Sequence, residues 1–511
     1  MLRALQQRRQ PEGKPKSIPA PVGGLNTRDA ISDMSVLDAI TMDNFFPTPS
    51  DVMLRQGRSD HITAISGQVQ TLMAYSAPSG STALYAAAGP LIYNATQATA
   101  TASTAVSGLT NAVWSYTNFT NTGGTSFLLC VNGADGLRSF DGTTWSQQAI
   151  TGTSASNFVH VSQHKRRLWF CKDDTLEAWY LNTDAVAGTA SRLDLSAFCR
   201  LGGELMATTG WTLDAGEGID DYWAAVTSNG EIIVYKGTDP ASASTWEMIG
   251  RWEVGKPLSR RCFAKLGGDV MYHAEDGLWP MAGLLATERT KPQLALSDKI
   301  ANSFKNAATD YRTNTGWQVI FWPRGTMVLV NIPVATGDNQ QQYVMNSITK
   351  AWGIFSGWDA NCFEVYRGNL YMGGNGIVSR VWDTFADDGV AITGEVKQAF
   401  SNLGNRWRKQ VTMARPILST NGSPATSFGF NVDYSNDNIL STLTYTPTTY
   451  AVWDTATWDS GIWGGGLNVS ANWINVAALG IVAAPRLKVQ ANGIEVRWQA
   501  TDCVLKPGSA M

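Results

Sequence analysis

Short apolar strands separated by tight turns fill the stretch from Gln342 to Asp383, and this pattern constrains the fold more than any other feature of the chain. Clusters of Gly, Asn and Asp separate the strands, and these residues tolerate turn conformations. Strands at intervals of about 8–12 residues with such turns predict a propeller, sandwich or barrel. The expected strands are Tyr343–Ser347, Trp352–Phe355, Cys362–Tyr366, Leu370–Gly373 and Ile377–Val381.

The same theme recurs from residue 61 to residue 385 without a strict sequence repeat. Roughly six clusters of two to four strands predict an all-β fold with a six-bladed propeller over this range. One longer helix is expected, over Asp298–Ala308, with Ser297 as its N-cap. Its apolar residues are Leu296, Ile300 and Phe304.

The segments before the propeller differ in character. Residues 1–17 are basic and polar and predict a flexible arm, which is either simply disordered or ordered on a neighbouring subunit. Residues 18–60 form an entry segment. The capping-box spacing from Ser35 to Asp38 predicts a short helix that carries Leu37 and Ile40.

Residues 386–511 predict a C-terminal, sandwich-like β-domain with longer strands. Asn492-Gly493 is a two-residue turn signal and predicts a hairpin. Its expected pairs are Ala491 with Ile494, Val489 with Val496, Leu487 with Trp498 and, on the other face, Lys488 with Arg497. The expected strands are Ala391–Phe400, Gln410–Leu418, Ser427–Tyr434, Arg486–Ala491 and Ile494–Ala500.

The charge distribution argues against a sequence-reading DNA-binding protein. The net charge is −3, with a basic N-terminal tip and a mildly acidic remainder. DNA-binding proteins grip phosphates through a basic face, which this body lacks. The acidity is either ordinary or suited to a channel wall that DNA must not adhere to. The six cysteines form no C-x-x-C pair, which predicts free thiols and assembly in a reducing cytoplasm. We expect no signal peptide and no membrane-spanning segment.

Three local motifs contain residue types found in chemical sites, but their context favours structural roles. Gly250–Pro257 has the spacing of a phosphate-binding loop, but Pro257 stands where Ser or Thr would hold magnesium. Ser139–Trp145 resembles the Asp-box of sialidase-type propellers, one residue short, and predicts a β-turn above Trp145. His160 and His164 have metal-ligand spacing only on a helix, whereas their surroundings predict a strand. The sequence therefore predicts no catalytic group, metal or cofactor.

Two groups of residues are candidates for an interface or a channel lining. The first is a basic cluster around Trp407, which is either a solvated loop, a contact to an acidic neighbour or a constriction near DNA. Its members are Arg406, Arg408, Lys409 and Arg415. The second is a series of tryptophans with a period of five, which either packs a sheet or forms a docking or sugar-binding surface. Its members are Trp453, Trp458 and Trp463.

Five sequence segments, which we call phrases, resemble in their order along the chain the corresponding segments of the tail nozzle proteins of short-tailed bacteriophages, also called packaged-DNA stabilisation proteins. Together they cover most of the chain. They are GGLNTRDA…DNFFP in the entry segment, LGGDVMYHAEDGLWPM at Leu266–Met281, LALSDKIANSF at Leu294–Phe304, YVMN…AW with LYMGGNGIV after it, and KQAFSNLGN at Lys397–Asn405.

This resemblance implies a structural virion protein, not an enzyme. A ring of six subunits would form the distal end of the tail, retain packaged double-stranded DNA and conduct it without reading its sequence. The implied partners are the adaptor ring below the portal and tailspike, fibre or needle proteins; the implied location is the virion tail, after assembly in the host cytoplasm. One rival is a carbohydrate-binding or glycosidase-type propeller of the same tail. A second rival is a scaffold propeller unrelated to phage.

Overall fold

The computed structural model describes residues 13–212, 222–286, 294–335, 340–437, 440–443 and 467–507. Within it the chain divides into two compact units. The propeller unit comprises Ser59–Tyr343 and Ser356–Val381, and the sandwich unit comprises Met1–Arg58, Val344–Phe355 and Trp382–Met511. No helix in the described ranges combines the length and the hydropathy that crossing a membrane requires.

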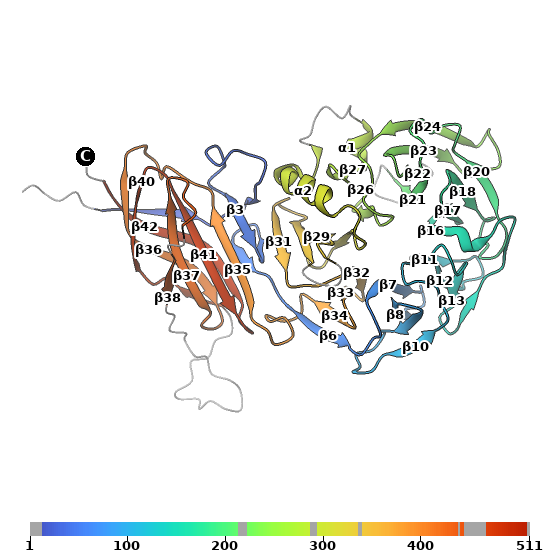
Figure 1. Cartoon of the computed structure of the whole chain (residues 1–511), viewed down its shortest axis with the longest axis horizontal. Helices are drawn as coiled ribbons and strands as arrows, with labels where there is room; N and C mark the ends of the chain where they lie inside the picture. The colour runs from blue at the N-terminus through green and yellow to red at the C-terminus, as the bar shows by residue number, and fades with distance from the viewer. Residues whose placement is uncertain are drawn as a thin grey trace, which may run out of the picture. The chain divides into compact units, whose positions relative to one another are not determined.

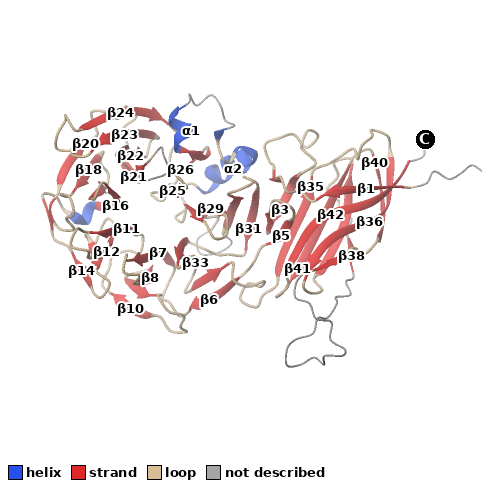
Figure 2. Ribbon diagram, turned by 180° about the vertical axis from the view of Figure 1, so that it is seen from behind, coloured by secondary structure: helices blue, strands red, loops and turns tan. Residues whose placement is uncertain are grey.

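The propeller unit contains six separate antiparallel sheets that follow one another around a common centre (Figures 1 and 2). The six sheets match the six-bladed propeller that the sequence predicts. The first four are β7 (Val69–Ser76), β8 (Thr82–Ala88), β9 (Leu91–Asn94) and β10 (Ser103–Val106); β11 (Ser115–Thr120), β12 (Ser126–Val131), β13 (Arg138–Phe140) and β14 (Trp145–Gln147); β16 (Phe158–His164), β17 (Arg167–Lys172), β18 (Glu177–Tyr180) and β20 (Ser191–Asp194); and β21 (Leu205–Trp211), β22 (Tyr222–Thr227), β23 (Glu231–Gly237) and β24 (Trp246–Glu253). The last two are β25 (Phe263–Leu266), β26 (Asp269–Ala274) and β27 (Gly277–Pro280); and β32 (Cys362–Tyr366), β33 (Asn369–Gly373), β34 (Val378–Val381) and β6 (Arg58–Ile62).

The hairpin of β28 (Gln318–Trp322) and β29 (Met327–Ile332) adds a further position to this ring, because β28 contacts β25 on one side and β32 on the other. The strands that follow in the ring, β32–β34, form their own sheet, which β6 completes. The remaining elements near this part of the chain are β15 (Ile150–Thr151), β19 (Gly188–Thr189), β30 (Gln341–Asn346), the 3-10 helix η1 (Ala155–Asn157) and α1 (Met281–Ala286).

The cores of the propeller unit lie between neighbouring sheets, where apolar side chains of both faces interdigitate. Between the third and fourth sheets, Trp169 packs on Trp223 and Trp246 with ring centroids 4.6 and 5.4 Å apart, and Tyr235 stacks on Trp246 at 5.5 Å. Aromatic pairs at these distances contribute beyond the area that they bury. The sheets are therefore held face to face by buried apolar surface.

The expected helix over Asp298–Ala308 is present, as η3 (Asp298–Ile300) followed by α2 (Ala301–Tyr311). Ser297 holds the predicted N-cap position, but its side chain makes no cap hydrogen bond: Oγ accepts the backbone N–H of Leu278 at 2.9 Å instead. The start of the helix is therefore tied to β27 and not closed on itself.

The sandwich unit is built from two sheets, and residues from both meet in its core. Phe428 of one sheet contacts Trp498 of the other, with ring centroids 6.3 Å apart. Gly394 is required where they meet, because a Cβ there would lie 2.5 Å from the Leu54 side chain and 2.8 Å from the Phe45 ring. One sheet holds β39 (Asn468–Ser470), β40 (Ile474–Gly480), β36 (Lys409–Thr420), β42 (Val496–Pro507), β1 (Lys14–Pro19), β5 (Val52–Leu54) and β4 (Phe45–Pro47). The other holds β31 (Trp352–Ser356), β2 (Gly24–Leu25), β3 (Asp38–Asp43), β35 (Ile392–Gln398), β41 (Ala483–Ala491), β37 (Ala425–Val432) and β38 (Ser441–Leu443).

The predicted Asn492-Gly493 hairpin is wrong. β41 pairs with β35 and β37 in one sheet, whereas β42 pairs with β36 in the other, so the turn carries the chain from sheet to sheet. Apolar residues alternate along β41 and β42 as they would in a hairpin, because both strands face the same core although they belong to different sheets. Lys488 accordingly lies opposite Glu395 and not opposite Arg497.

Two predictions in the entry segment are also corrected. The helix expected after Ser35 is strand β3, whose pairing with β35 supplies backbone partners that outweigh the local capping-box spacing. The arm does not extend to residue 17, because β1 pairs with β42 from Lys14 onward. Residues 1–12 lie outside the described part of the chain.

A buried ion pair fixes the entry segment within the sandwich unit. Arg55, whose side chain is 1% exposed, donates from Nη1 and Nη2 to the two carboxylate oxygens of Asp387 at 2.9 and 2.5 Å. Its Nε donates to Asn44 Oδ1 at 2.9 Å. A bidentate pair of this kind offsets the cost of burying the guanidinium.

The substitution Asp387→Asn should lower the free energy of unfolding by about 3 kcal/mol, because it leaves a buried cation without its counter-charge. Urea unfolding followed by tryptophan fluorescence would measure the change. The neighbouring, exposed Asp388→Asn is the control and should change stability little. Equal stability of the two variants would contradict this account.

Candidate functional site

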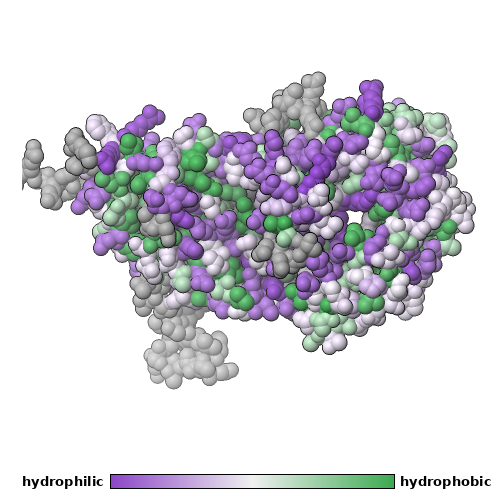
Figure 3. Space-filling view, viewed as in Figure 1, coloured by the Kyte–Doolittle hydropathy of each residue, from purple (hydrophilic) through white to green (hydrophobic). Residues whose placement is uncertain are grey.

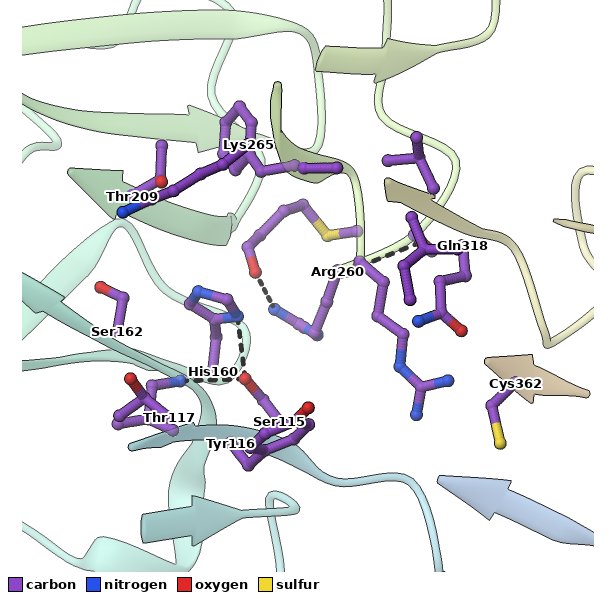
Figure 4. A pocket seen from close by; sticks show the side chains of 18 of the residues that line it. Ser115, Tyr116, Thr117, His160, Ser162, Thr209, Arg260, Lys265, Gln318 and Cys362 are labelled. Atoms are coloured by element: carbon purple, nitrogen blue, oxygen red, sulfur yellow. Dashed lines mark hydrogen bonds between the residues drawn. The ribbon is translucent and has the colours of Figure 1, made fainter. Parts of the chain in front are cut away.

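The centre of the propeller unit holds a cavity of about 1300 Å³. Its wall is formed by the first strand of each sheet and by β28, so seven inner strands line it. Figure 3 shows hydrophilic residues gathered around this opening, and Figure 4 shows polar side chains of its wall. We call this cavity the lumen.

Side chains bridge each inner strand, or the residues just before it, to the next one around the whole ring. Most bridges end on a backbone carbonyl of the neighbouring strand or of the residues just before it, and a hydrogen bond to a buried carbonyl avoids the cost of leaving it unpaired. The wall is therefore a closed belt of hydrogen bonds. The bridges are Asn118 Nδ2 to Ala74 O (2.8 Å), Ser115 Oγ to His160 Nδ1 (3.1 Å), His160 Nε2 to Thr208 O (3.0 Å), Arg260 Nη1 to Leu205 O (3.1 Å), Ser259 Oγ to Trp317 O (2.8 Å), Gln318 Nε2 to Phe363 O (2.9 Å) and Cys362 Sγ to Val69 O (3.5 Å).

His160 is a structural member of this belt. Burial lowers its pKa to about 4, so the ring is neutral at pH 7. In the neutral ring, Nε2 donates to the Thr208 carbonyl and Nδ1 accepts the Ser115 hydroxyl. Both nitrogens are thereby used, which agrees with the structural role expected for His160. Burial likewise lowers the pKa of His164, to about 3.

Eight charged residues line the lumen, and six of them are basic. The acidity of the body as a whole does not extend to this wall. Three of the cations form ion pairs: Arg166 with Asp184, Arg260 with Asp173 and Glu204, and Arg312 with Glu275. The charged residues are Lys165, Arg166, Arg260, Arg261, Lys265 and Arg312, with Asp269 and Glu364.

Arg261 crosses the lumen. From the segment before β25, its Nη2 donates to the carbonyl of Gln70 at 2.9 Å and to Thr71 Oγ1 at 2.6 Å, both on or beside β7. β28 and β32 stand between β25 and β7 in the ring, so the side chain reaches across the opening and not along its wall.

Glu364 projects from β32 beside the Arg261 side chain. Burial raises the pKa of its carboxyl to about 7, while hydrogen bonding to Tyr116 and the charge of Arg261 oppose that rise. Burial also raises the pKa of the Tyr116 hydroxyl well above its usual value, so this group donates the bond. Glu364 thus changes charge near neutral pH, inside the lumen.

The residues predicted from the sequence do not form this site. Arg406 and Arg408 are exposed beside Trp407, which is 79% exposed, so their interface role stays a prediction. Arg415 pairs with Asp502 at 2.8 Å and lies over Trp473, 4.9 Å from its ring centre.

Lys409 is buried and does not belong to a surface cluster. Its Nζ donates to the carbonyls of Asn402, Asn405 and Ile481 at 2.7, 2.9 and 2.5 Å and so holds the preceding loop. Trp453, Trp458 and Trp463 lie outside the described residues.

Two of the local sequence motifs are a turn and a strand in the structure. The Asp141 carboxylate accepts the backbone N–H groups of Thr143 and Thr144 at 2.8 and 2.7 Å, which makes the predicted turn. Gly250 lies in strand β24 and not in a loop before a helix. All six cysteines are free, as expected, and five are buried. In the described ranges no group of three or more His, Cys, Asp or Glu residues is placed to hold a metal.

The lumen residues were missed because no local pattern marks them. Arg261, Tyr116 and Glu364 come from three different sheets and are far apart in sequence. The available signal was the polar residue at alternate positions of each first strand, as in Ser115–Thr120, which a half-buried strand shows in any setting.

No family model matches the chain, and no curated protein matches its sequence. Solved structures similar to it include BBS1N in complex with ARL6DN (11% identity, TM-score 0.41, covering 65% of this chain and 99% of that one). Others are Sqt1 of Saccharomyces cerevisiae (12% identity, TM-score 0.40, covering 64% and 98%) and the WD40 β-propeller domain of Doa1 (8% identity, TM-score 0.38, covering 64% and 96%). At such low similarity these structures carry no argument. The sheet topology of the chain itself is that of a mainly β protein with a six-bladed propeller and further large sheets outside that ring.

Removing one link of the belt should loosen the ring locally. Gln318 also accepts the backbone N–H of Phe363 at 2.9 Å. The substitution Gln318→Ala therefore removes the hydrogen-bond partners of both the N–H and the carbonyl of Phe363, which is buried. We expect a loss of about 2 kcal/mol of stability and faster hydrogen exchange at the Phe363 amide. Gln163→Ala, at an exposed lumen position, is the control; unchanged exchange at Phe363 in the Gln318 variant would contradict the belt.

Glu364 should make stability fall as pH rises. Its folded pKa of about 7 lies above its ordinary value of 4.5, so between these values the folded chain holds a proton that the unfolded chain has released. Stability from this group is complete below about pH 4.5 and is lost as pH rises through 7. Glu364→Gln should reduce the difference in unfolding free energy between pH 5 and pH 8 by about 2 kcal/mol. Glu247→Gln, on an exposed face of β24, should keep the wild-type profile, and so would Glu364→Gln if this account were wrong.

Proposed function

We propose that this chain is a structural virion protein that forms the distal tail nozzle of a short-tailed phage. In this role a ring of subunits, six by resemblance to the nozzle proteins, retains packaged DNA and conducts it during ejection. The ring would also dock the adaptor above it and tailspike, fibre or needle proteins at its tip and sides. The role is mechanical and requires no catalysis.

The observation that carries the proposal is the order of the five resembling phrases, which fall in both units. The opening phrase supplies β2 to β4 of the sandwich unit. LGGDVMYHAEDGLWPM supplies β26 and β27, and LALSDKIANSF supplies η3 and the first turn of α2. KQAFSNLGN begins at the end of β35. The resemblance therefore concerns the whole architecture and not a single propeller sheet.

The geometry suits this role. Closed sheets with few free edges make rigid bodies for a heterologous ring. Because Arg261 crosses the lumen, we assign the DNA path to the opening between subunits and not to the centre of each propeller. The basic lumen walls, which would grip phosphates, then stay away from the moving DNA.

Electron microscopy of particles made with and without this gene tests the proposal. If particles lacking the protein end in a blunt stub and lose their DNA, while complete particles carry a six-fold tube at the tip, the nozzle function holds. If the tail instead stays complete and DNA-tight but fails to bind cells, the proposal is wrong. That outcome favours the rival carbohydrate-binding or glycosidase-type propeller, whose activity would depend on carboxylates and exposed tryptophans.

A further inference from the structure

Arg261 keeps unused hydrogen-bond donors inside the lumen. Both hydrogen bonds of its side chain to described residues leave from Nη2, to Gln70 and Thr71, and its guanidinium forms no ion pair with them. A guanidinium has five N–H groups in a planar fork. The Nε and Nη1 donors therefore remain for a partner that the protein itself does not supply.

Lys265 is a second cation available in the same lumen. Its exposed side chain lines the cavity and has no hydrogen bond or ion pair to any described residue. Together with Lys165 it lowers the pKa of His164, after burial, so these charges act on one region of the wall. Figure 4 shows Lys265 among the lining side chains.

Little negative charge inside the lumen balances these two cations. The acids that pair with Arg166, Arg260 and Arg312 do not line the cavity. Of the two lining carboxylates, Asp269 accepts Trp211 Nε1 at 3.0 Å and the N–H of Val270 at 2.8 Å. The other, Glu364, carries only part of its charge at neutral pH.

We propose that the lumen is a binding site for a small polyanion, a molecule with phosphate or carboxylate groups. The Nε and Nη1 donors of Arg261 and the ammonium group of Lys265 hold it. A planar guanidinium matches two oxygens of such a group, and the ammonium adds a second positive charge. The closed belt limits the ligand to a small molecule that fits about 1300 Å³. This site is independent of the nozzle function, because it needs only one folded chain.

Isothermal titration calorimetry of the full-length protein at low salt tests the site, with inorganic pyrophosphate in one arm and citrate in the other. We expect saturable binding of one molecule per chain to at least one of the two. Binding in a single arm identifies the chemical class, and binding in both shows that charge and shape suffice.

Variants locate the binding. Arg261→Gln should weaken it about tenfold or more, and Lys265→Gln several-fold, because each removes a charge-assisted contact. Arg261→Lys keeps the charge but loses the fork and should bind more weakly than wild type. Lys305→Gln, an exposed lysine of α2 outside the cavity, is the control.

The exposed position of Lys265 makes its variant informative even if Arg261→Gln perturbs the ring. Thermal unfolding of each variant without ligand shows whether the fold is kept. No heat in either arm would overturn the proposal, and so would binding that both Arg261→Gln and Lys265→Gln leave unchanged, because the anion would then bind elsewhere.

Discussion

The propeller ring closes because every inner strand is bound to the next by a side chain that reaches a polar group of its neighbour. Antiparallel pairing holds each sheet together, but it cannot join one sheet to another, since the inner strands of adjacent sheets do not share a ladder. Buried aromatic and aliphatic side chains supply most of the attraction between sheets but fix no register. The belt of Asn118, Ser115, His160, Arg260 and Gln318 adds that register, because a hydrogen bond tolerates little displacement.

A second consequence of closure is that polar groups must gather in the lumen. The apolar side chains of each inner strand enter the cores between neighbouring sheets. Its polar side chains and backbone groups face the opening. His160 shows how fully such groups are used, with both ring nitrogens bonded. Arg261 and Lys265 differ, because donors remain after the structural bonds are counted. Residues beyond those needed for closure are where a function is best sought.

The sequence predicted strands well where turn residues and alternation agree. Cys362–Tyr366 is reproduced residue for residue, and the six sheets follow from the same reasoning. The prediction from the sequence failed where a strand pairs with a partner that lies far along the chain. Val489 and Val496 face one core from two sheets, and a local pattern cannot distinguish that from a hairpin. The helix expected after Ser35 failed for the same reason, since β35 pairs with that segment from more than three hundred residues away.

The site was less predictable than the fold, and the reason is physical. A basic cluster in sequence need not be one in space: Lys409 turns inward to three carbonyls, whereas Arg406 and Arg408 stay exposed. The lumen charges come together only when the ring closes. Each propeller has a basic lumen, whereas the body of the chain is mildly acidic. If the assembled protein conducts DNA, this separation matters, because the basic lumen would bind phosphates and the acidic body would repel them. A nozzle subunit can therefore contain a strongly cationic cavity without retarding DNA, provided that the cavity is closed to the duplex, as the Arg261 strut makes it.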